Sequence, residues 1–304
     1  MNKNRSLTGV LPVFQTPFRA DETIDFDTLA REISWLYDCG SDGIVMAMVS
    51  EVLRLSSDER MKLAEAACRL GRDRGVVVIS VGAESAKIAE EYSRHAESIG
   101  AAAVMAIPPV SVAVGEVELR KYYERIIRAT KLPVIVQDAS GYVGRPMSIA
   151  MQADLLKEFG ADRVLFKPEA SPIGPRLSAL HEATQGQAKV FEGSGGIALV
   201  DSYRRGIVGT MPGADLIRGI VALWRALKSD DERRIYQLSL PISSLIAVQN
   251  SLDAFLAIEK YLLVKQGIFT STIVRGPVGY RLDEQTRLEI ERLFDLVISA
   301  VEEK

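Results

Sequence analysis

Residues 76–107 read VVVISVGAESAKIAEEYSRHAESIGAAAVMAI and contain one complete strand–helix–strand unit. Val76–Val81 is a short, β-branched run of the kind that forms a buried strand. A helix is predicted from Ser85 to Ile99, and Gly100 follows it in the position where helices commonly end. A second apolar run, Ala103–Ile107, completes the unit. This order predicts two parallel strands joined by a helix.

The same pattern repeats along the chain until about Pro212. The other strands are predicted at Val10–Phe14, Gly43–Met48, Val134–Gln137, Val164–Lys167, Lys189–Phe191 and Val208–Met211. The other helices are predicted at Asp25–Cys39, Ser56–Arg72, Val117–Thr130, Ser148–Phe159, Ile173–Thr184, Ile197–Arg205 and Ala214–Lys228. Continuous apolar strands are typical of a parallel sheet that is buried on both faces. Eight such units favour a closed (β/α)₈ TIM barrel over an open sheet, and no Gly-x-Gly-x-x-Gly follows the first strand to support a dinucleotide fold.

After Lys228 the pattern changes to helices only. These helices are predicted at Asp231–Val248, Ser251–Gln266 and Leu282–Glu303. No linker or low-complexity stretch separates them from the preceding units. We therefore expect a catalytic barrel at residues 1–228 and a C-terminal helical extension at residues 229–304 that packs on the barrel.

Composition excludes several classes of function. The 304 residues are 47% hydrophobic and 25% charged, with a formal net charge of −3, and the basic residues are scattered. This balance gives no electrostatic footprint for nucleic acid. No apolar run is long enough for a membrane span, and the first residues lack the apolar stretch of a signal peptide. With only two cysteines and two histidines, we expect a cytoplasmic protein that needs no metal and no cofactor.

The chemistry of such a barrel lies at the carboxyl ends of its strands. The polar residues that the predicted strands place there are Thr16, Ser50, Glu51, Gln137, Asp138, Lys167, Glu169, Glu192, Ser194 and Thr210. Lys167 stands out because it ends an apolar strand, where loss of hydration disfavours the ammonium form and leaves free amine as a nucleophile. The alternatives are that Lys167 extends to water or pairs with Glu169.

Ordered motifs carry a family resemblance. They are Thr16-Pro17-Phe18 after the first strand, Glu51 in the second loop, Pro133–Asp138, Phe166-Lys167-Pro168-Glu169, Gly206-x-x-Gly209 with Pro212, and Lys260, Gly267, Arg275 and Pro277 in the tail. Over essentially its whole length the chain resembles the class I aldolase superfamily of dihydrodipicolinate synthase and N-acetylneuraminate lyase. The resemblance implies that Lys167 forms a Schiff base with a small 2-oxo acid.

The chain departs from the synthase pattern at several places, including the tyrosine position near Val110 and the arginine position near Tyr142, where Arg145 lies close by in the sequence. Ala47–Glu51 carries one hydroxyl, Ser50, where the synthase has two adjacent threonines, and Gln137 replaces the tyrosine that relays protons. An amide cannot act as an acid or a base near neutral pH. Met48–Glu51, Gln137-Asp138 and Phe166–Glu169 instead resemble 2-keto-3-deoxy-pentonate dehydratases of the L-arabonate type, which remove a proton from C3 and a hydroxyl from C4.

These considerations give a set of candidate site residues. The expected catalytic residues are Lys167, Glu169, Ser50 and Gln137. The expected substrate-binding residues are Thr16, Val49, Glu51, Asp138, Arg145, Glu192, Gly193, Ser194 and Thr210. The candidates for the base beside C3 and the acid beside the departing hydroxyl are Glu169, Asp138, Ser50 and Glu192. Glu169 is two residues from Lys167, so a regular strand would place both on one side. Structural alternatives are that Glu51 organises its loop, that Asp138 caps a turn or pairs with Arg145, and that Gly193 belongs to a flexible turn.

The sequence thus predicts a Schiff-base lyase, and dehydration of a 2-keto-3-deoxy sugar acid is the leading reaction. A pyruvate-dependent aldolase or condensing enzyme would use the same imine. A barrel that binds a 2-oxo acid without turnover is the third alternative. We expect a homodimer or a homotetramer, with no nucleic-acid or membrane partner.

Overall fold

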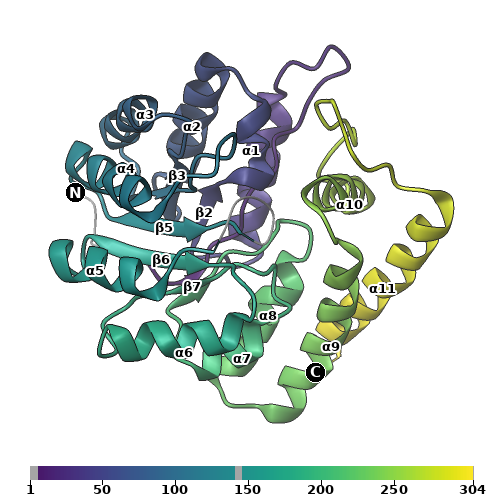
Figure 1. Ribbon diagram of the computed structural model, residues 1–304. Helices are drawn as coiled ribbons and strands as arrows, with labels where there is room; N and C mark the ends of the chain where they lie inside the picture. Colours follow the sequence, from purple (N-terminus) through teal and green to yellow (C-terminus); the bar gives the residue numbers. More distant parts are fainter. Residues whose placement is uncertain (1–5, 141–145, 304) are drawn as a thin grey trace.

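The computed structural model describes residues 6–140 and 146–303 and shows a closed barrel of parallel strands surrounded by helices (Figure 1). The strands are β1 (Gly9–Val10), β2 (Gly43–Met46), β3 (Val76–Ser80), β4 (Ala103–Ala106), β5 (Val134–Asp138), β6 (Val164–Pro168), β7 (Phe191–Glu192) and β8 (Gly209–Thr210). They pair in the orders β2-β3-β4-β5-β6 and β1-β8-β7. Single parallel bridges, Val13 to Val45 and Phe166 to Val190, join the two sets. The (β/α)₈ barrel expected from the sequence is confirmed.

One helix follows each strand. They are α1 (Phe26–Asp38), α2 (Ser57–Gly71), α3 (Ala86–Ser98), α4 (Glu116–Ala129), α5 (Ile149–Phe159), α6 (Ile173–Ala183), α7 (Leu199–Arg204) and α8 (Ile217–Lys228). Local chemistry sets their ends. Ser56 and Glu59 form a capping box at the start of α2. Gly100, which follows α3, has a φ of 83°, a left-handed conformation that glycine adopts without strain.

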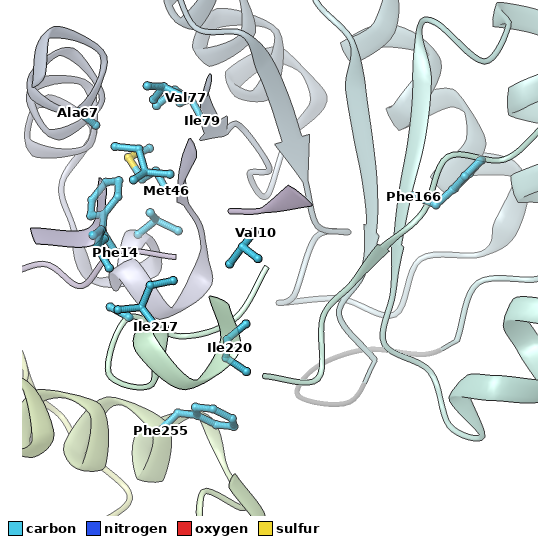
Figure 2. Packing of buried hydrophobic residues seen from close by; sticks show 14 of the residues in the cluster. Val10, Phe14, Met46, Ala67, Val77, Ile79, Phe166, Ile217, Ile220 and Phe255 are labelled. Atoms are coloured by element: carbon cyan, nitrogen blue, oxygen red, sulfur yellow. The ribbon is translucent and has the colours of Figure 1, made fainter. Parts of the chain in front are cut away.

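Both faces of the strands are buried, which explains their continuous apolar runs. One face packs inside the barrel, where Val45, Val78, Ile135 and Leu165 belong to a compact cluster. The other face packs against the helices, and Figure 2 shows Met46, Val77 and Ile79 in that layer with Ala67 of α2. Because side chains alternate along a strand, residues two positions beyond Ile135 and Leu165 also face the interior. Those residues are Gln137 and Lys167.

Three helices follow the barrel, namely α9 (Glu232–Val248), α10 (Leu252–Lys265) and α11 (Glu284–Glu302). Helix α9 packs against α8 and α11. Figure 1 shows α9, α10 and α11 together on one side of the barrel. Helix α10 contacts the short 3₁₀ helix η1 (Met48–Ser50) that follows β2. The C-terminal helices therefore reach the carboxyl end of the barrel. None of the described helices combines the length and the apolar composition needed to cross a membrane.

Several predicted strands are longer than the observed ones, among them the first, predicted at Val10–Phe14 and observed at Gly9–Val10, and the second. We expected the second strand to extend to Met48, but β2 ends at Met46 and the chain forms η1 and then a second 3₁₀ helix, η2 (Val52–Arg54). Two local features account for the change. The Ala47 amide donates to Ser50 Oγ (3.1 Å), and Glu51 takes a left-handed conformation with φ 56°. A side chain–backbone hydrogen bond here competes with the strand ladder.

Candidate active site

A narrow cavity of about 30 Å³ lies at the carboxyl ends of the strands. It is lined by Val13, Ala47, Met48, Val49, Gln137, Lys167, Glu169, Gly193, Gly195, Met211, Pro212, Gly213, Phe255 and Glu259. A wider pocket of about 280 Å³ adjoins it and shares Glu169, Gly193 and Phe255. The end of α9 and the start of α10 form one wall of the wider pocket, so the C-terminal helices contribute to the site.

Lys167 and Glu169 form the polar centre of the narrow cavity. Lys167 is 4% exposed and Glu169 is 6% exposed, and the Lys167 ammonium contacts Glu169 Oε1 in a buried ion pair. The sequence left open whether Lys167 pairs with Glu169, and the structure contains that pair. The pairing is compatible with catalysis, since the carboxylate can accept the ammonium proton and leave a free amine.

Gln137 holds Glu169 from the neighbouring strand. Gln137 is paired in register with Lys167 across β5 and β6, and its Nε2 donates to Glu169 Oε1 (3.0 Å). Among the described residues, Glu169 Oε2 has no hydrogen-bond partner. Burial raises the pKa of Glu169, opposed by the nearby Lys167 and by the hydrogen bonds from Lys167 and Gln137. The free oxygen belongs to a residue that lines the cavity, which is the position a base requires.

Gly193 allows this pair to lie close to the next strand. A methyl group added at Gly193 would come within 2.8 Å of Glu169 Oε1 and 2.9 Å of Lys167 Nζ. Such contacts are shorter than side-chain carbons tolerate. Gly193 is therefore glycine because of close packing around the amine, and its backbone lines both pockets.

The loop after β2 contributes one candidate residue to the cavity wall. Two other candidates, Ser50 in this loop and Thr16 in the segment after β1, join the loop to that segment. Val49 lines the cavity. The Ser50 hydroxyl donates to Phe14 O (2.5 Å) and the Thr16 hydroxyl donates to Ser50 O (2.6 Å). Both residues are fully buried, and neither lines the narrow cavity. In this structure their hydroxyls fasten the loop to the segment after β1.

Glu51 faces away from the narrow cavity. Its carboxylate pairs with the Lys260 ammonium from α10 and accepts the Arg275 backbone N–H (3.0 Å). It is 2% exposed and does not line the cavity. This placement corresponds to the loop-organising role that the sequence offered as the structural alternative for Glu51.

Three other candidates bind one another at the ends of β7 and β8. The hydroxyl and backbone N–H of Ser194 both donate to Glu192 Oε1, and the Thr210 hydroxyl donates to Glu192 Oε2 (2.8 Å). Ser194 lines the wider pocket, whereas Glu192 and Thr210 line neither pocket. Glu192 thus positions the turn that contains Gly193.

Asp138 caps the loop after β5. It accepts the backbone N–H of Ser140 (3.0 Å) and of Met147 (2.9 Å), and it is 1% exposed. Its turn-capping role was one of the alternatives drawn from the sequence. Arg145, the other residue expected in this loop, lies outside the described residues.

Among the lining residues that the candidate set missed are Phe255 and Glu259, which come from α10. One signal was available. Residues 252–265 read LDAFLAIEKYLLVK, and the Glu259-Lys260 pair interrupts an otherwise apolar stretch. Charged residues in the middle of a buried helix need partners, and such residues are often functional.

The arrangement as a whole suits carbonyl chemistry. It offers one buried amine, one carboxylate with a free oxygen beside it, and largely apolar walls. An amine in such surroundings can condense with a carbonyl carbon, and the adjacent carboxylate can move the protons that condensation requires.

Comparison with known proteins agrees with this geometry. Residues 6–295 match the model of the dihydrodipicolinate synthetase family. The chain is 30% identical over 293 residues to L-2-keto-3-deoxyarabonate dehydratase from Azospirillum brasilense, covering 93% of this chain and 92% of that relative. It is 32% identical over 142 residues to 4-hydroxy-tetrahydrodipicolinate synthase from Moorella thermoacetica, covering 46% of this chain and 49% of that enzyme.

A solved structure shows the same fold. It is a prophage protein of the dihydrodipicolinic acid synthase family from Escherichia coli K12, in complex with pyruvate. The two chains superpose with a TM-score of 0.88 at 23% identity, covering 96% of this chain and 99% of the other. At this level of identity the likeness concerns the fold alone.

Proposed function

Because the chain belongs to the dihydrodipicolinate synthetase family and is therefore a Schiff-base lyase, we propose that it dehydrates a 2-keto-3-deoxy sugar acid. The observation that carries the proposal is the buried set of Lys167, Glu169 and Gln137. It supplies an amine and a carboxylate base without the tyrosine of the synthases. The similarity to an L-2-keto-3-deoxyarabonate dehydratase along nearly the whole chain supports the same reaction.

In the proposed mechanism, Glu169 first takes a proton from the Lys167 ammonium. The amine attacks C2 of the 2-oxo acid, Glu169 returns its proton to the carbinolamine hydroxyl, and water leaves, which gives a protonated imine and restores the Glu169 carboxylate. The protonated imine withdraws electrons from C3, so a C3 proton becomes acidic and passes to the carboxylate of Glu169. The resulting enamine expels the C4 hydroxyl, and hydrolysis of the imine releases the unsaturated product and restores Lys167.

Gln137 has a positioning role in this scheme. Its amide donates to Glu169 Oε1, the same oxygen that the lysine contacts. That leaves Glu169 Oε2, which lacks a partner among the described residues, to take the C3 proton. An amide can hold this geometry at any pH because it does not titrate.

Borohydride reduction in the presence of pyruvate tests the imine. We expect the intact mass to rise by one reduced pyruvate adduct in the wild type and in Lys189→Ala, which removes a half-exposed lysine paired with Asp162. Lys167→Ala should give no adduct. An adduct that persists in Lys167→Ala would show that another amine forms the imine.

A panel of 2-keto-3-deoxy acids then separates dehydration from carbon–carbon cleavage. We expect the product to be an unsaturated or rearranged 2-oxo acid. Its mass should be about 18 Da below that of the substrate, because one water is lost. Pyruvate and an aldehyde as products would identify an aldolase instead. Binding without any product would favour a barrel that only binds the 2-oxo acid.

The role of Glu169 can be tested without knowing the substrate. Enamine formation exchanges the methyl protons of pyruvate for deuterium in D₂O, which NMR follows directly. We expect Glu169→Gln to keep the borohydride adduct but to slow this exchange by about 10²-fold or more. Glu182→Gln, at an exposed position on α6, is the control. Unchanged exchange in Glu169→Gln would remove Glu169 from the mechanism.

We also propose that the enzyme acts as a homodimer or a homotetramer, as expected from the family resemblance. Light scattering coupled to size-exclusion chromatography measures the mass directly. A mass of one 33.3 kDa chain would contradict the proposal.

A further inference from the structure

Helix α10 brings a carboxyl group to the narrow cavity from outside the barrel. Glu259 has no exposed surface in the structure, yet it lines the same cavity as Lys167 and Glu169. It lies against the backbone of Gly213, where an added methyl group would overlap Glu259 Oε1. Glycine at position 213 is therefore what lets this carboxyl group approach the cavity.

The two oxygens of Glu259 have different surroundings. Oε2 accepts a hydrogen bond from the Gln15 side chain. Among the described residues, no N–H or O–H group donates to Oε1. The carboxyl group of Glu259 also contacts that of Asp215, to which the Gln249 side chain donates (3.2 Å). Two carboxyl groups can make such a contact only when they share a proton.

The surrounding charges favour that proton. Asp215, Glu259 and Glu32 of α1 are all buried. Gln15 lies between the two glutamates, because its backbone N–H donates to Glu32 and its side chain donates to Glu259. Lys260 acts on Glu32, but its ammonium is paired with Glu51. Burial raises the pKa of Asp215 to about 6 and raises the pKa of Glu259 and Glu32 as well. Holding a carboxylic acid neutral near pH 7 in this way makes it a proton donor.

We propose that Glu259, in its protonated form, is the acid that protonates the hydroxyl group leaving from C4, and that Asp215 positions it. The proposal rests on the dehydration proposed above and names the second acid–base residue of that reaction. Glu169 lies beside the lysine and serves as the base, whereas Glu259 reaches the cavity from α10 beside the segment after β8. The proton acceptor and the proton donor are therefore different carboxyl groups.

The step balances as follows. Glu169 holds the proton removed from C3, and the enamine carries the electron pair. The pair moves toward C4, the C4–O bond breaks, and the oxygen takes the proton of Glu259 and leaves as water. Glu259 is then a carboxylate beside Asp215; before the next turnover it regains a proton from solvent, and Glu169 releases the proton taken from C3 to solvent. No oxidant, reductant or metal is required.

Changing the leaving group distinguishes an acid from a structural residue. A substrate analogue with chloride at C4 needs no proton to lose its leaving group. We expect Glu259→Gln to slow the hydroxyl substrate by at least about 100-fold and the chloride analogue by less than about 3-fold. Lys167 trapping with pyruvate and exchange of the pyruvate methyl protons should remain. Equal loss on both substrates would overturn the proposal and make Glu259 a structural residue.

Glu32→Gln is the matched control. Glu32 is also a fully buried acid of this cluster, but it accepts the Gln15 backbone N–H (2.8 Å) and does not line the cavity. It should slow the two substrates by the same small factor. A leaving-group effect as large in Glu32→Gln as in Glu259→Gln would contradict the assignment to Glu259.

The wild-type protein provides a test that does not depend on folding of a variant. With the hydroxyl substrate, turnover should fall at high pH as Glu259 loses its proton, and it should be slower in D₂O. With the chloride analogue this alkaline limb and the isotope effect should be absent. Asp215, Glu32 and the neutral Gln15 act on Glu259, and Lys167 and Glu169 line the same cavity, so the limb reports the cluster rather than a single free carboxyl group. The same pH profile for both substrates would overturn the proposal.

Failure of the proposed function has a different signature. If the wild type forms no Lys167 adduct, or dehydrates no 2-keto-3-deoxy acid, the dehydratase proposal fails and the role of Glu259 fails with it. If the wild type forms the adduct and dehydrates its substrate while Glu259→Gln does so at the wild-type rate, only the role of Glu259 is overturned.

Discussion

The protein contains two buried lysine–glutamate pairs of the same chemistry but with different surroundings. Lys167 and Glu169 lie at the end of β6, whereas Lys260 and Glu51 join α10 to the loop after β2. The Lys260 ammonium contacts three acceptors, namely Glu51 and the carbonyl oxygens of Thr16 (2.8 Å) and Ile273 (2.7 Å). Among the described residues, the Lys167 ammonium contacts Glu169 alone. The Lys260–Glu51 pair is saturated with partners, whereas the Lys167–Glu169 pair borders a cavity.

This comparison shows that burial and charge do not by themselves identify a nucleophile. Burial lowers the pKa of Lys260, opposed by Glu51, and an amine with a lowered pKa is a usual sign of reactivity. Yet Lys260 has no exposed surface and does not line the narrow cavity. What separates the two lysines is the number of acceptors that each ammonium already has and its access to a cavity. Lys260 therefore stabilises the fold and Lys167 is left for chemistry.

The strongest test of this comparison exchanges each lysine for methionine. Lys260→Met leaves the buried Glu51 carboxylate without its main cation, so we expect a loss of about 3–5 kcal/mol in the free energy of unfolding. Lys167→Met leaves Glu169 beside a cavity with Gln137 still donating to it, and Glu169 can take up a proton. We expect a smaller loss of stability there than in Lys260→Met, with no imine formed. Urea unfolding and borohydride trapping measure the two effects.

A double variant checks the reason for the difference. Adding Glu51→Gln to Lys260→Met removes the uncompensated charge and should recover about 1–3 kcal/mol. Equal destabilisation by the two lysine variants, or no recovery in the double variant, would mean that the two pairs have the same role.

The lysine at the end of β6 could be predicted from the sequence, because an apolar run followed by lysine fixes both its strand and its position. Glu169 followed from its spacing of two residues along the same strand. Glu259 could not be predicted in this way. Its place depends on how α10 docks across the barrel end, which brings it beside Gln15, 244 positions earlier in the chain. Local patterns contain no information about such long-range packing.

The hydroxyl residues show a second limit. Thr16 and Ser50 lie in the segments that follow β1 and β2, and their side chains bond to backbone carbonyl oxygens of the neighbouring segment. The direction of a side chain in a loop depends on the loop conformation. Here the 3₁₀ turn and the left-handed Glu51 set that direction, and neither was apparent from the apolar run that precedes them.

A smaller effect is expected from crowding the reactive pair. In Gly193→Ala the new methyl group must displace Glu169 or the end of Lys167. We expect the rate of imine formation to fall by about 10- to 100-fold, equivalent to about 1.4–2.7 kcal/mol, with a smaller loss of stability. Stopped-flow trapping with pyruvate measures the rate.

Gly115→Ala is the matched control for Gly193→Ala. Gly115 precedes α4, has a φ of −73°, and has no atom within 4 Å of the added methyl group. It should leave imine formation unchanged. A rate for Gly193→Ala equal to that of Gly115→Ala would show that the contacts around the Lys167–Glu169 pair do not limit its reactivity.

The smallest expected effect is a difference in pH dependence between the two regions. The region around Lys260 includes Arg275, whose guanidinium binds the Glu59 carboxylate and lowers its pKa from 4.5 to about 2. A lowered pKa contributes stability above pH 4.5 that is lost as the pH falls through about 2. Glu169 has a raised pKa because of burial, so its contribution is present below pH 4.5 and is lost as the pH rises. The two regions therefore oppose each other across the acid range.

Two variants separate these contributions. Since the Glu59 side chain is 32% exposed, its pair with Arg275 should contribute only on the order of 1 kcal/mol. Glu59→Gln should therefore be less stable than the wild type at pH 7 by about that amount and equally stable at pH 2, as measured by urea unfolding. Glu169→Gln should have the opposite dependence, gaining stability relative to the wild type as the pH rises from 4 toward 8. If both variants changed stability in the same direction with pH, the carboxylate beside Lys167 would be as fully compensated as the one beside Arg275, and the contrast between the two regions would fail.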